Sequence, residues 1–235
     1  MHLTHFAPRS QSASPAARPA AKAATISAAL ALLLAAAPQA QAADGISDPA
    51  GDFLGSFTGA HAGDLDVLSA TVLYDATSHL FSLSATFAGN VGTTPSAFFV
   101  WGVNRGGGTA GFAAQGLTGV RFDRVIFLRP GGVSSVQVAG NLAPGSVSWS
   151  GSTLTAIIPE AMLPSNGFAN KLDYTWNLWP RDGAVAGFAA ISDFAPNNAN
   201  FTTTAGTVTA VAEPATAALM LGGVMGLLAW RRRSI

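Results

Sequence analysis

Short segments of alternating apolar and polar residues fill the middle of the chain. In residues 66–74 and 80–87, apolar side chains recur at every second position, and Ser or Thr occupies many of the positions between them. A period of two places neighbouring side chains on opposite faces of a β-strand. The connection at residues 75–78 consists of Asp, Ala, Thr and Ser and is turn-like. We therefore expect the two segments to pair as a hairpin.

Five further segments continue this series, and Gly, Ser, Thr, Asn and Asp clusters separate them. They are residues 97–103, 124–128, 133–138, 154–158 and 173–179. The first is apolar on both faces, which is typical of a central strand. Residues 159–163, bounded by Pro164, are expected to form one helical turn. Short strands with frequent turn signals predict a mainly β fold, a single antiparallel β-sandwich of jelly-roll or Ig-like type over residues 43–201. The small, Thr-rich residues 202–212 are predicted to be an exposed spacer.

An apolar run of Ala, Leu and Ile covers residues 23–37, close to the start of the chain. Basic residues precede it, and Pro38 and the small-residue pattern Ala40-Gln41-Ala42 follow it. This order is typical of a secretory signal peptide, which we place at residues 1–42 with cleavage after Ala42. The alternative is an uncleaved membrane anchor, for which the run is short. The chain is thus expected to pass through the secretion translocon.

A second apolar run, residues 215–230, is followed at once by Arg231, Arg232 and Arg233. A helix of this length covers about 24 Å, somewhat less than a hydrocarbon core of about 30 Å. The arginines can extend the span by snorkelling. They also favour the cytoplasmic side of the membrane. We predict a transmembrane helix over residues 215–230 with its N-terminal end outside.

The sequence Glu213-Pro214, the apolar helix with its glycines and the terminal arginine cluster together resemble the PEP-CTERM sorting signal, over residues 213–235. Ala212 stands where that family usually has its first proline. The resemblance implies recognition by an exosortase, a membrane transpeptidase that cuts near this motif. It also implies an inner-membrane intermediate in a Gram-negative envelope, then a cell-surface or extracellular location with exopolysaccharide. An ordinary single-pass anchor is the alternative.

The whole chain has no formal net charge, but its basic residues are concentrated at the two ends. The middle holds six basic and eleven acidic side chains, a net charge of −5. An acidic domain is repelled by phosphate backbones, so we expect no nucleic-acid partner. The chain has no cysteine. This excludes disulfides, thiolate zinc sites and cysteine nucleophiles.

Four aspartates form the strongest chemical pattern. Asp48 and Asp52 flank a Pro-Ala-Gly turn, and Asp64 and Asp66 are two residues apart, so in an extended segment they point to the same side. Calcium binds hard oxygen ligands, and a cation stabilises clustered like charges. We therefore consider a Ca²⁺ site at these four residues. The alternative is that Asp-Pro and Gly-Asp are simply turn formers.

The segment 174–181 predicts a second site. Its period places Trp176 and Leu178 on the core face and Asn177, Trp179 and Arg181 on the other. An indole beside an amide and a guanidinium can bind a sugar by stacking and hydrogen bonding. The alternative is that a loop covers the indole, since tryptophan is usually buried. Scattered motifs between residues 48 and 159 also resemble DOMON-like and carbohydrate-binding sandwich modules.

No catalytic motif supports an enzyme. His61, His79 and Glu160 occupy separate positions without a G-x-S-x-G motif, and a glycosidase needs two carboxylates at a set separation. The glycine run 105–108 lacks the Lys and Ser/Thr of a phosphate loop and is expected to be a flexible turn. We predict a non-enzymatic surface or extracellular-matrix protein that binds carbohydrate. The alternatives are a purely structural surface protein and a secreted polysaccharide-active or ester hydrolase.

Overall fold

The computed structural model describes residues 45–208 of the chain. The predicted signal peptide, the sorting motif with Ala212, Glu213 and Pro214, the transmembrane helix 215–230 and the terminal arginines lie outside the described residues. Within residues 45–208, no helix is both long enough and apolar enough to cross a membrane.

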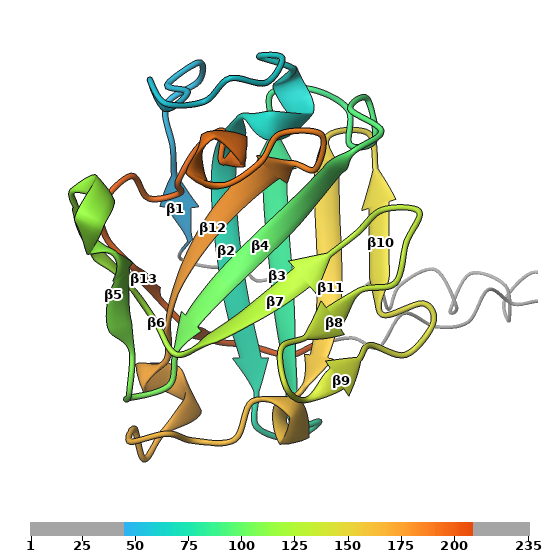
Figure 1. Cartoon of the computed structure of the whole chain (residues 1–235). Helices are drawn as coiled ribbons and strands as arrows, with labels where there is room; N and C mark the ends of the chain where they lie inside the picture. The colour runs from blue at the N-terminus through green and yellow to red at the C-terminus, as the bar shows by residue number, and fades with distance from the viewer. Residues whose placement is uncertain (1–44, 209–235) are drawn as a thin grey trace, which may run out of the picture. The chain divides into compact units, whose positions relative to one another are not determined.

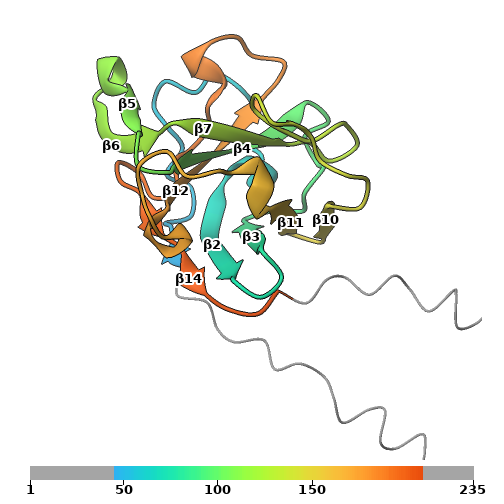
Figure 2. The same cartoon turned by 90° about the horizontal axis from the view of Figure 1, so that it is seen from below.

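Two six-stranded sheets form the body of the described part (Figure 1). The first sheet contains β1 (Ile46–Ser47), β2 (Val67–Asp75), β3 (Leu80–Phe87), β11 (Thr153–Pro159) and β10 (Val147–Ser150) in that order, with β14 (Thr204–Ala205) also paired to β2. The second contains β13 (Phe201–Thr202), β12 (Thr175–Asp182), β4 (Ala97–Asn104), β7 (Arg124–Leu128), β8 (Ser135–Val136) and β9 (Gly140–Asn141). Figure 2 shows β4 and β7 of the second sheet on one side and β2, β3, β10 and β11 of the first on the other.

Shorter elements complete the described chain. β5 (Thr109–Phe112) and β6 (Leu117–Phe122) form a separate hairpin. Five single-turn 3₁₀ helices are η1 (Gly63–Leu65), η2 (Ala113–Gln115), η3 (Glu160–Met162), η4 (Lys171–Asp173) and η5 (Phe188–Ala190). Every strand pair is antiparallel except β14 with β2. The prediction of a mainly β, antiparallel fold is therefore confirmed.

The main core lies between the two sheets, as the alternating sequence pattern predicts. In β3 every second side chain is buried, and Phe81 and Phe87 are among them. Phe81 meets Trp176 of β12 edge-on, with 5.6 Å between ring centroids, and Phe87 meets Phe99 of β4 at 4.6 Å. These contacts join the two sheets, because each aromatic side chain removes a large apolar area from water.

A second, smaller core covers the outer face of the second sheet. Val100 of β4 and Trp179 of β12 lie on this face and pack with Val120 of the β5–β6 hairpin and with Ile191 and Phe194 after η5. This cover explains why β4 is apolar on both faces. The prediction of a central strand at residues 97–103 is confirmed, since β4 lies between β12 and β7.

Local pattern and structure agree for the longest strands. The β2–β3 hairpin, β7 at residues 124–128 and the single turn η3 at residues 160–162 lie where the sequence predicts them. The pattern missed β1, β5, β6, β9, β10, β13 and β14. These strands are two to six residues long, and each contains Gly, Ser or Thr.

The start of the predicted spacer belongs to the fold, which corrects the domain boundary at residue 201. β14 pairs in parallel with β2, with Thr204 opposite Leu73. The buried Thr203 hydroxyl accepts a hydrogen bond from Trp176 Nε1 at 2.8 Å and donates one to the Tyr174 carbonyl at 2.9 Å. Threonine suits strands and can satisfy buried polar partners. A Thr-rich stretch is therefore compatible with the sheet edge as well as with a spacer.

The glycine run 105–108 is not a freely flexible turn. Arg105 and Asp123 form an ion pair with Nε to Oδ1 at 2.9 Å, and their side chains are only 4% and 7% exposed. The same carboxylate accepts the Gly107 N–H at 3.1 Å. The Arg105 carbonyl accepts the N–H groups of Asn166 and Phe168 at 3.1 and 3.0 Å. These contacts join the run to the loop 164–168.

Candidate metal centre

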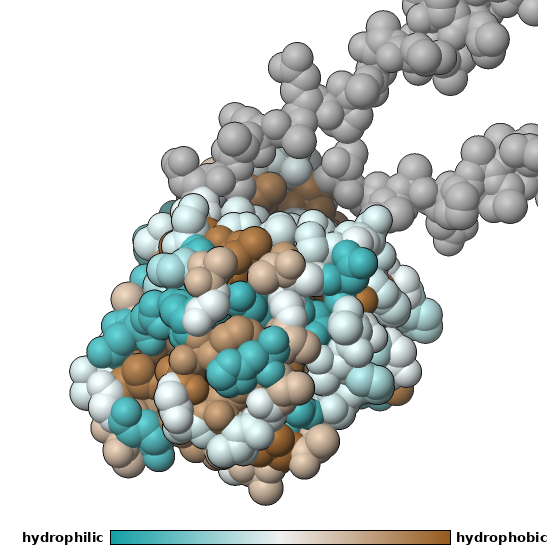
Figure 3. Space-filling view, turned by 90° about the horizontal axis from the view of Figure 1, so that it is seen from above, coloured by the Kyte–Doolittle hydropathy of each residue, from teal (hydrophilic) through white to brown (hydrophobic). Residues whose placement is uncertain are grey.

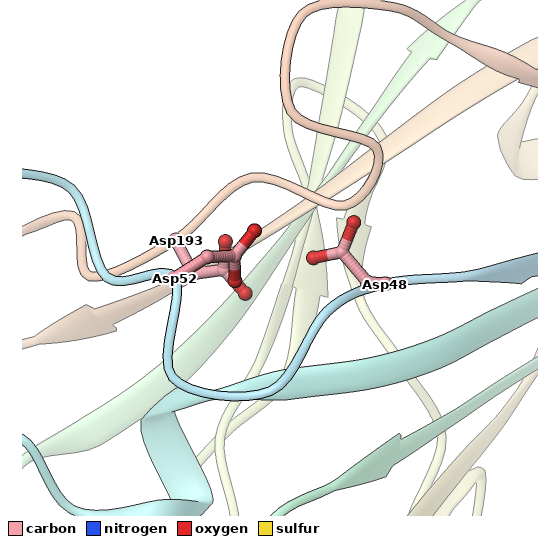
Figure 4. Close-up of side chains that lie close together, drawn as sticks. All are labelled: Asp48, Asp52 and Asp193. Atoms are coloured by element: carbon pink, nitrogen blue, oxygen red, sulfur yellow. The ribbon is translucent and has the colours of Figure 1, made fainter.

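Three carboxylates meet where the loop after β1 passes the segment after η5. Asp48 and Asp52 belong to the loop, and Asp193 belongs to the segment. One oxygen of each lies within 4.8 Å of the other two. Figure 4 shows the Asp52 and Asp193 carboxyl groups side by side, with the Asp48 carboxyl directed toward them.

Backbone hydrogen bonds hold the loop in place at both ends. Asp48 N–H donates to the Leu68 carbonyl at 2.9 Å and continues the β1–β2 pairing. Leu54 N–H donates to the Ser192 carbonyl at 2.8 Å and attaches the loop to the segment that carries Asp193. Between these anchors, Gly51 has a φ of +80°, a conformation that favours glycine. The turn-forming residues therefore also bring the carboxylates together.

The fully buried Asp193 is fixed by two backbone donors. Its Oδ2 accepts the Val67 N–H at 3.1 Å, and its Oδ1 accepts the Phe194 N–H at 2.6 Å. The first bond connects the segment to the start of β2. These contacts orient the carboxyl group without supplying a positive charge.

Asp66 adds a fourth carboxylate beside the three. It is 4% exposed, and its Oδ2 accepts the Gly51 N–H at 2.9 Å. Its Oδ1 has no hydrogen-bond partner, and the same is true of Asp48 Oδ2 and Asp52 Oδ1. Buried polar atoms are nearly always paired, because an unpaired one loses its hydration without compensation. Three such oxygens in one small region are available to a ligand.

Burial and mutual repulsion raise the pKa values of these carboxyl groups. Burial raises the pKa of Asp193 to about 8, and the negative charges of Asp48 and Asp52 add to the effect. Burial and the charge of Asp52 raise the pKa of Asp48 to about 7. Burial also raises the pKa of Asp66. A bound cation would favour the ionised carboxylates, and would so offset the effects of burial and of the neighbouring negative charges on these pKa values.

The donor set suits calcium. Calcium takes about six to eight oxygens at roughly 2.3–2.6 Å. Two oxygens bound to one such ion lie no more than about 5 Å apart. The 4.8 Å limit among Asp48, Asp52 and Asp193 permits a shared ion. Backbone carbonyls and water would supply the remaining ligands, with Asp66 next to the cluster.

Of the four predicted calcium ligands, Asp48 and Asp52 belong to the cluster. Asp66 lies next to it, where it accepts the Gly51 N–H, but Asp64 does not join them. Its two oxygens accept the Thr94 N–H at 2.7 Å and the Thr94 hydroxyl at 2.8 Å, so it anchors a loop on another side. The expectation that Asp64 and Asp66 share one side is corrected, because residues 63–65 form η1 rather than an extended strand.

Sequence reasoning missed Asp193. It lies far along the chain from the other ligands, between Ser192 and Phe194, without a second acid nearby. Its one local signal is an acidic residue inside an otherwise apolar stretch. Only the packing of the segment after η5 against the loop after β1 reveals its role.

The predicted sugar-binding surface is also corrected. Trp179 and Asn177 do lie on the outer face of β12, but they are only 2% and 1% exposed. The Asn177 side-chain amide donates to the carbonyls of Pro196 and Ala199, and Arg181 Nη2 donates to the Gly187 carbonyl at 2.6 Å. The rings that cover the indole, at centroid distances of 5.1–5.7 Å, are those of Phe112, Phe122 and Phe194.

The structure brings His79 and Glu160 together, a pairing that the sequence pattern did not predict. His79 Nδ1 lies 2.9 Å from Glu160 Oε2, and the Tyr74 hydroxyl donates to the same oxygen. Lys171 Nζ lies 3.7 Å from Glu160 Oε1. This group joins the β2–β3 turn to η3 and contains a single carboxylate. His61 lies elsewhere and stacks on Phe53 at 4.4 Å.

The loops around the carboxylates form one end of the described domain. Figure 3 views the molecule from above, and hydrophobic side chains reach the surface there between hydrophilic ones. Comparison of the chain with protein-family models, with curated proteins and with solved structures finds no match. The assignment of the carboxylate cluster therefore depends on its geometry.

Proposed function

We propose that the chain is an exported surface protein whose β-sandwich domain is a non-catalytic module stabilised by calcium. The convergence of Asp48, Asp52 and Asp193 beside the unpaired Asp66 oxygen carries this proposal. These groups form a concentrated set of hard oxygens, and the described residues place no cationic side chain within ion-pair distance of them.

The strand order supports a jelly-roll type of sandwich. β3 pairs with β11 in the first sheet. The strands that follow them along the chain, β4 and β12, pair with each other in the second sheet. One antiparallel ribbon thus runs across both sheets. Double-sheet jelly rolls are built by wrapping such ribbons.

The proposed calcium site is consistent with the proposed export of the chain. Calcium sites of extracellular modules typically have dissociation constants of about 10⁻⁴–10⁻³ M, so they fill outside the cell. A site with few protein ligands belongs in this range. The chain has no cysteine. A bound ion would therefore supply the cross-link that disulfides supply in many exported domains.

The export route follows from the two ends of the chain. We propose that residues 1–42 direct it through the secretion translocon, and that residues 213–235 hold it in the inner membrane until an exosortase cleaves near Glu213-Pro214. The product is then released to the cell surface or to an exopolysaccharide matrix.

Export and calcium binding can be tested on the same protein. The full chain is expressed in a Gram-negative host with or without an exosortase, and the cell fractions are compared by mass. We expect a shortened extracellular product only with the exosortase, and retention in the membrane when Glu213 and Pro214 are both replaced by Ala. Equilibrium dialysis of the product against about 10 mM calcium, roughly ten times the weakest dissociation constant expected for an extracellular module, should approach one bound ion per chain. Intact chain in the cytosol would contradict the export proposal, and absence of bound calcium would contradict the metal proposal.

A further inference from the structure

In the described part of the chain, β10 (Val147–Ser150) leaves one edge of the first sheet without a partner strand. It is the last strand in the order of that sheet, and Figure 1 shows it at the outer edge. The end strands β1, β9 and β13 of the two large sheets are two residues long, whereas β10 has four. A longer bare edge offers its backbone N–H and C=O groups to an additional strand.

The pairing of β10 with β11 fixes which backbone groups face outward. The Ser146 carbonyl accepts the Ile157 N–H at 2.8 Å, so the backbone of Ser146 is directed toward β11. Backbone groups alternate in direction along a strand. Those of Ser148 therefore also face β11, whereas those of Val147 and Trp149 point away from it. Val147 and Trp149 thus present their N–H and C=O groups at the bare edge.

The indole of Trp149 lies at the open side of the sandwich. Trp149 is opposite Leu154 of β11, and Leu154 belongs to the main core, so the indole is on the inner face of the first sheet. It is nevertheless 46% exposed, while the three tryptophans of the second sheet are at most 2% exposed. This inward-facing side chain is therefore left partly uncovered by the rest of the described domain.

A hollow of about 490 Å³ adjoins the indole. Its lining includes the apolar side chains of Val133, Leu142, Pro144 and Val147, together with Trp149. Val133 is 64% exposed. Exposed apolar groups that gather in one place mark an interaction surface. Here they lie directly beside a strand edge that lacks a neighbour.

The edge carries no acidic side chain, although the domain is acidic. β10 reads Val-Ser-Trp-Ser, and no acid lines either hollow beside Trp149. Arg129 also lines the first hollow, but its guanidinium lies over the Phe98 and Phe127 rings on the outer face of the second sheet. The middle of the chain has a net charge of −5, so two copies that approach by other faces repel each other. At this edge they can meet without contact between acids.

We propose that two copies of the chain associate through β10, antiparallel and about a two-fold axis at Ser148. In this register Val147 of each copy is opposite Trp149 of the other, and their outward N–H and C=O groups pair with one another. Each indole then covers Val147 of the second copy and the hollow beside it. The inference goes beyond the proposed function and rests on the fold alone.

The same register agrees with the outer face of the sheet. Ser148 Oγ lies 2.8 Å from Thr155 Oγ1 of β11, and in the dimer Ser148 would also meet Ser148 of the second copy. Cross-strand hydroxyl pairs of this kind stabilise a sheet. A register shifted by two residues would place Val147 opposite the Gly151 turn and so lose its hydrogen bonds. The strand is therefore complementary to itself in one register, which favours a second copy over a foreign strand.

Single cysteines test the register, because the chain has none of its own. In the proposed pairing the two Ser148 Cα atoms are about 4.5 Å apart, a distance that a disulfide spans. The two Ser150 Cα atoms would be roughly 14 Å apart, which is too far. Mild oxidation of the exported Ser148→Cys chain should give a covalent dimer. Ser150→Cys is the matched control, since it is exposed on the same strand and face, and it should remain monomeric.

Sedimentation equilibrium of the exported chain measures the association itself. The wild type should dimerise reversibly with a dissociation constant on the order of 10–100 μM, because the interface is small. Trp149→Lys should weaken the dimer at least tenfold, since it places a charge at the paired edge. Val138→Lys adds the same charge to a side chain that is 89% exposed and lines neither hollow beside Trp149, so it should dimerise like the wild type.

Two further measurements on the same samples separate the possible outcomes. Melting temperatures close to that of the wild type show that both lysine variants are folded. Calcium binding should be equal in all variants, so failure of this inference leaves the metal proposal intact. The inference is overturned if the wild type stays monomeric at about 1 mM, if Ser148→Cys and Ser150→Cys cross-link equally, or if Trp149→Lys dimerises like the wild type.

Discussion

The carboxyl oxygens of Asp48 and Asp193 approach within 4.8 Å, although one belongs to the first loop of the described chain and the other to one of its last. An ion bound by both would connect the loop after β1 to the segment after η5. That segment also covers Trp179 through Phe194. Calcium would thus stabilise the smaller core as well as its own ligands.

Calcium should raise the melting temperature of the domain. A ligand that binds only the folded state at about 100 times its dissociation constant adds about 2.7 kcal/mol. For a domain of this size the expected shift is roughly 5–10 °C. Differential scanning fluorimetry with calcium and then with excess chelator measures the rise and its reversal. An unchanged melting temperature in both conditions would contradict calcium binding.

The stability of the calcium-free domain should fall as the pH rises. The pKa of Asp48 is raised to about 7 and that of Asp193 to about 8, from 3.8. The folded state therefore holds protons that the unfolded state has released, and stability is present below about pH 4 and lost as the pH rises through 7–8. Melts in chelator between pH 5 and 9 should show this decline. Melts in saturating calcium should show less of it, because the ion replaces the protons.

Asp75 should have the opposite pH dependence. The backbone N–H groups of Val208 and Thr77, with smaller contributions from Ser78, lower its pKa to about 2. Its contribution is present above about pH 4 and lost as the pH falls toward 2. Asp75→Asn should speed hydrogen exchange at the Val208 amide, which donates to Asp75 at 3.0 Å. The exposed Asp173→Asn is the control and should leave that amide unchanged.

Two tryptophan substitutions should have different effects on stability. Trp179→Ala removes a side chain that is 2% exposed, so we expect a loss of about 3–5 kcal/mol. Trp149→Ala removes one that is 46% exposed and should cost much less. Chemical denaturation of both variants compares the two losses. Equal losses would show that Trp149 contributes to the core as much as Trp179 does.

The sequence predicted what depends on local periodicity. β2 and β3 alternate clearly, and their inner faces form the core as expected. Periodicity predicted the correct face of β12 for Trp179. It could not show that the β5–β6 hairpin covers that face, because the cover comes from distant residues.

The candidate metal site, too, could be predicted only where its residues lie close together in the sequence. Asp48, Asp52 and Asp66 could be found because they lie in one short stretch of the chain. Asp64 was grouped with them on the assumption of an extended strand, but residues 63–65 form the 3₁₀ helix η1. Asp193 reaches the site only through tertiary packing. Such non-local pairings have no signature in a single sequence.

Calorimetric titration of the chelator-treated exported chain with calcium at pH 8 tests the metal site most directly. Asp193→Asn and Asp64→Asn are the paired variants, since both replace a fully buried carboxylate and only the first lies in the cluster. We predict one ion per wild-type chain with a dissociation constant of about 0.1–1 mM, no binding by Asp193→Asn, and undiminished binding by Asp64→Asn. A wild type that gives no binding heat, or an Asp193→Asn variant that binds calcium equally well, would contradict the account.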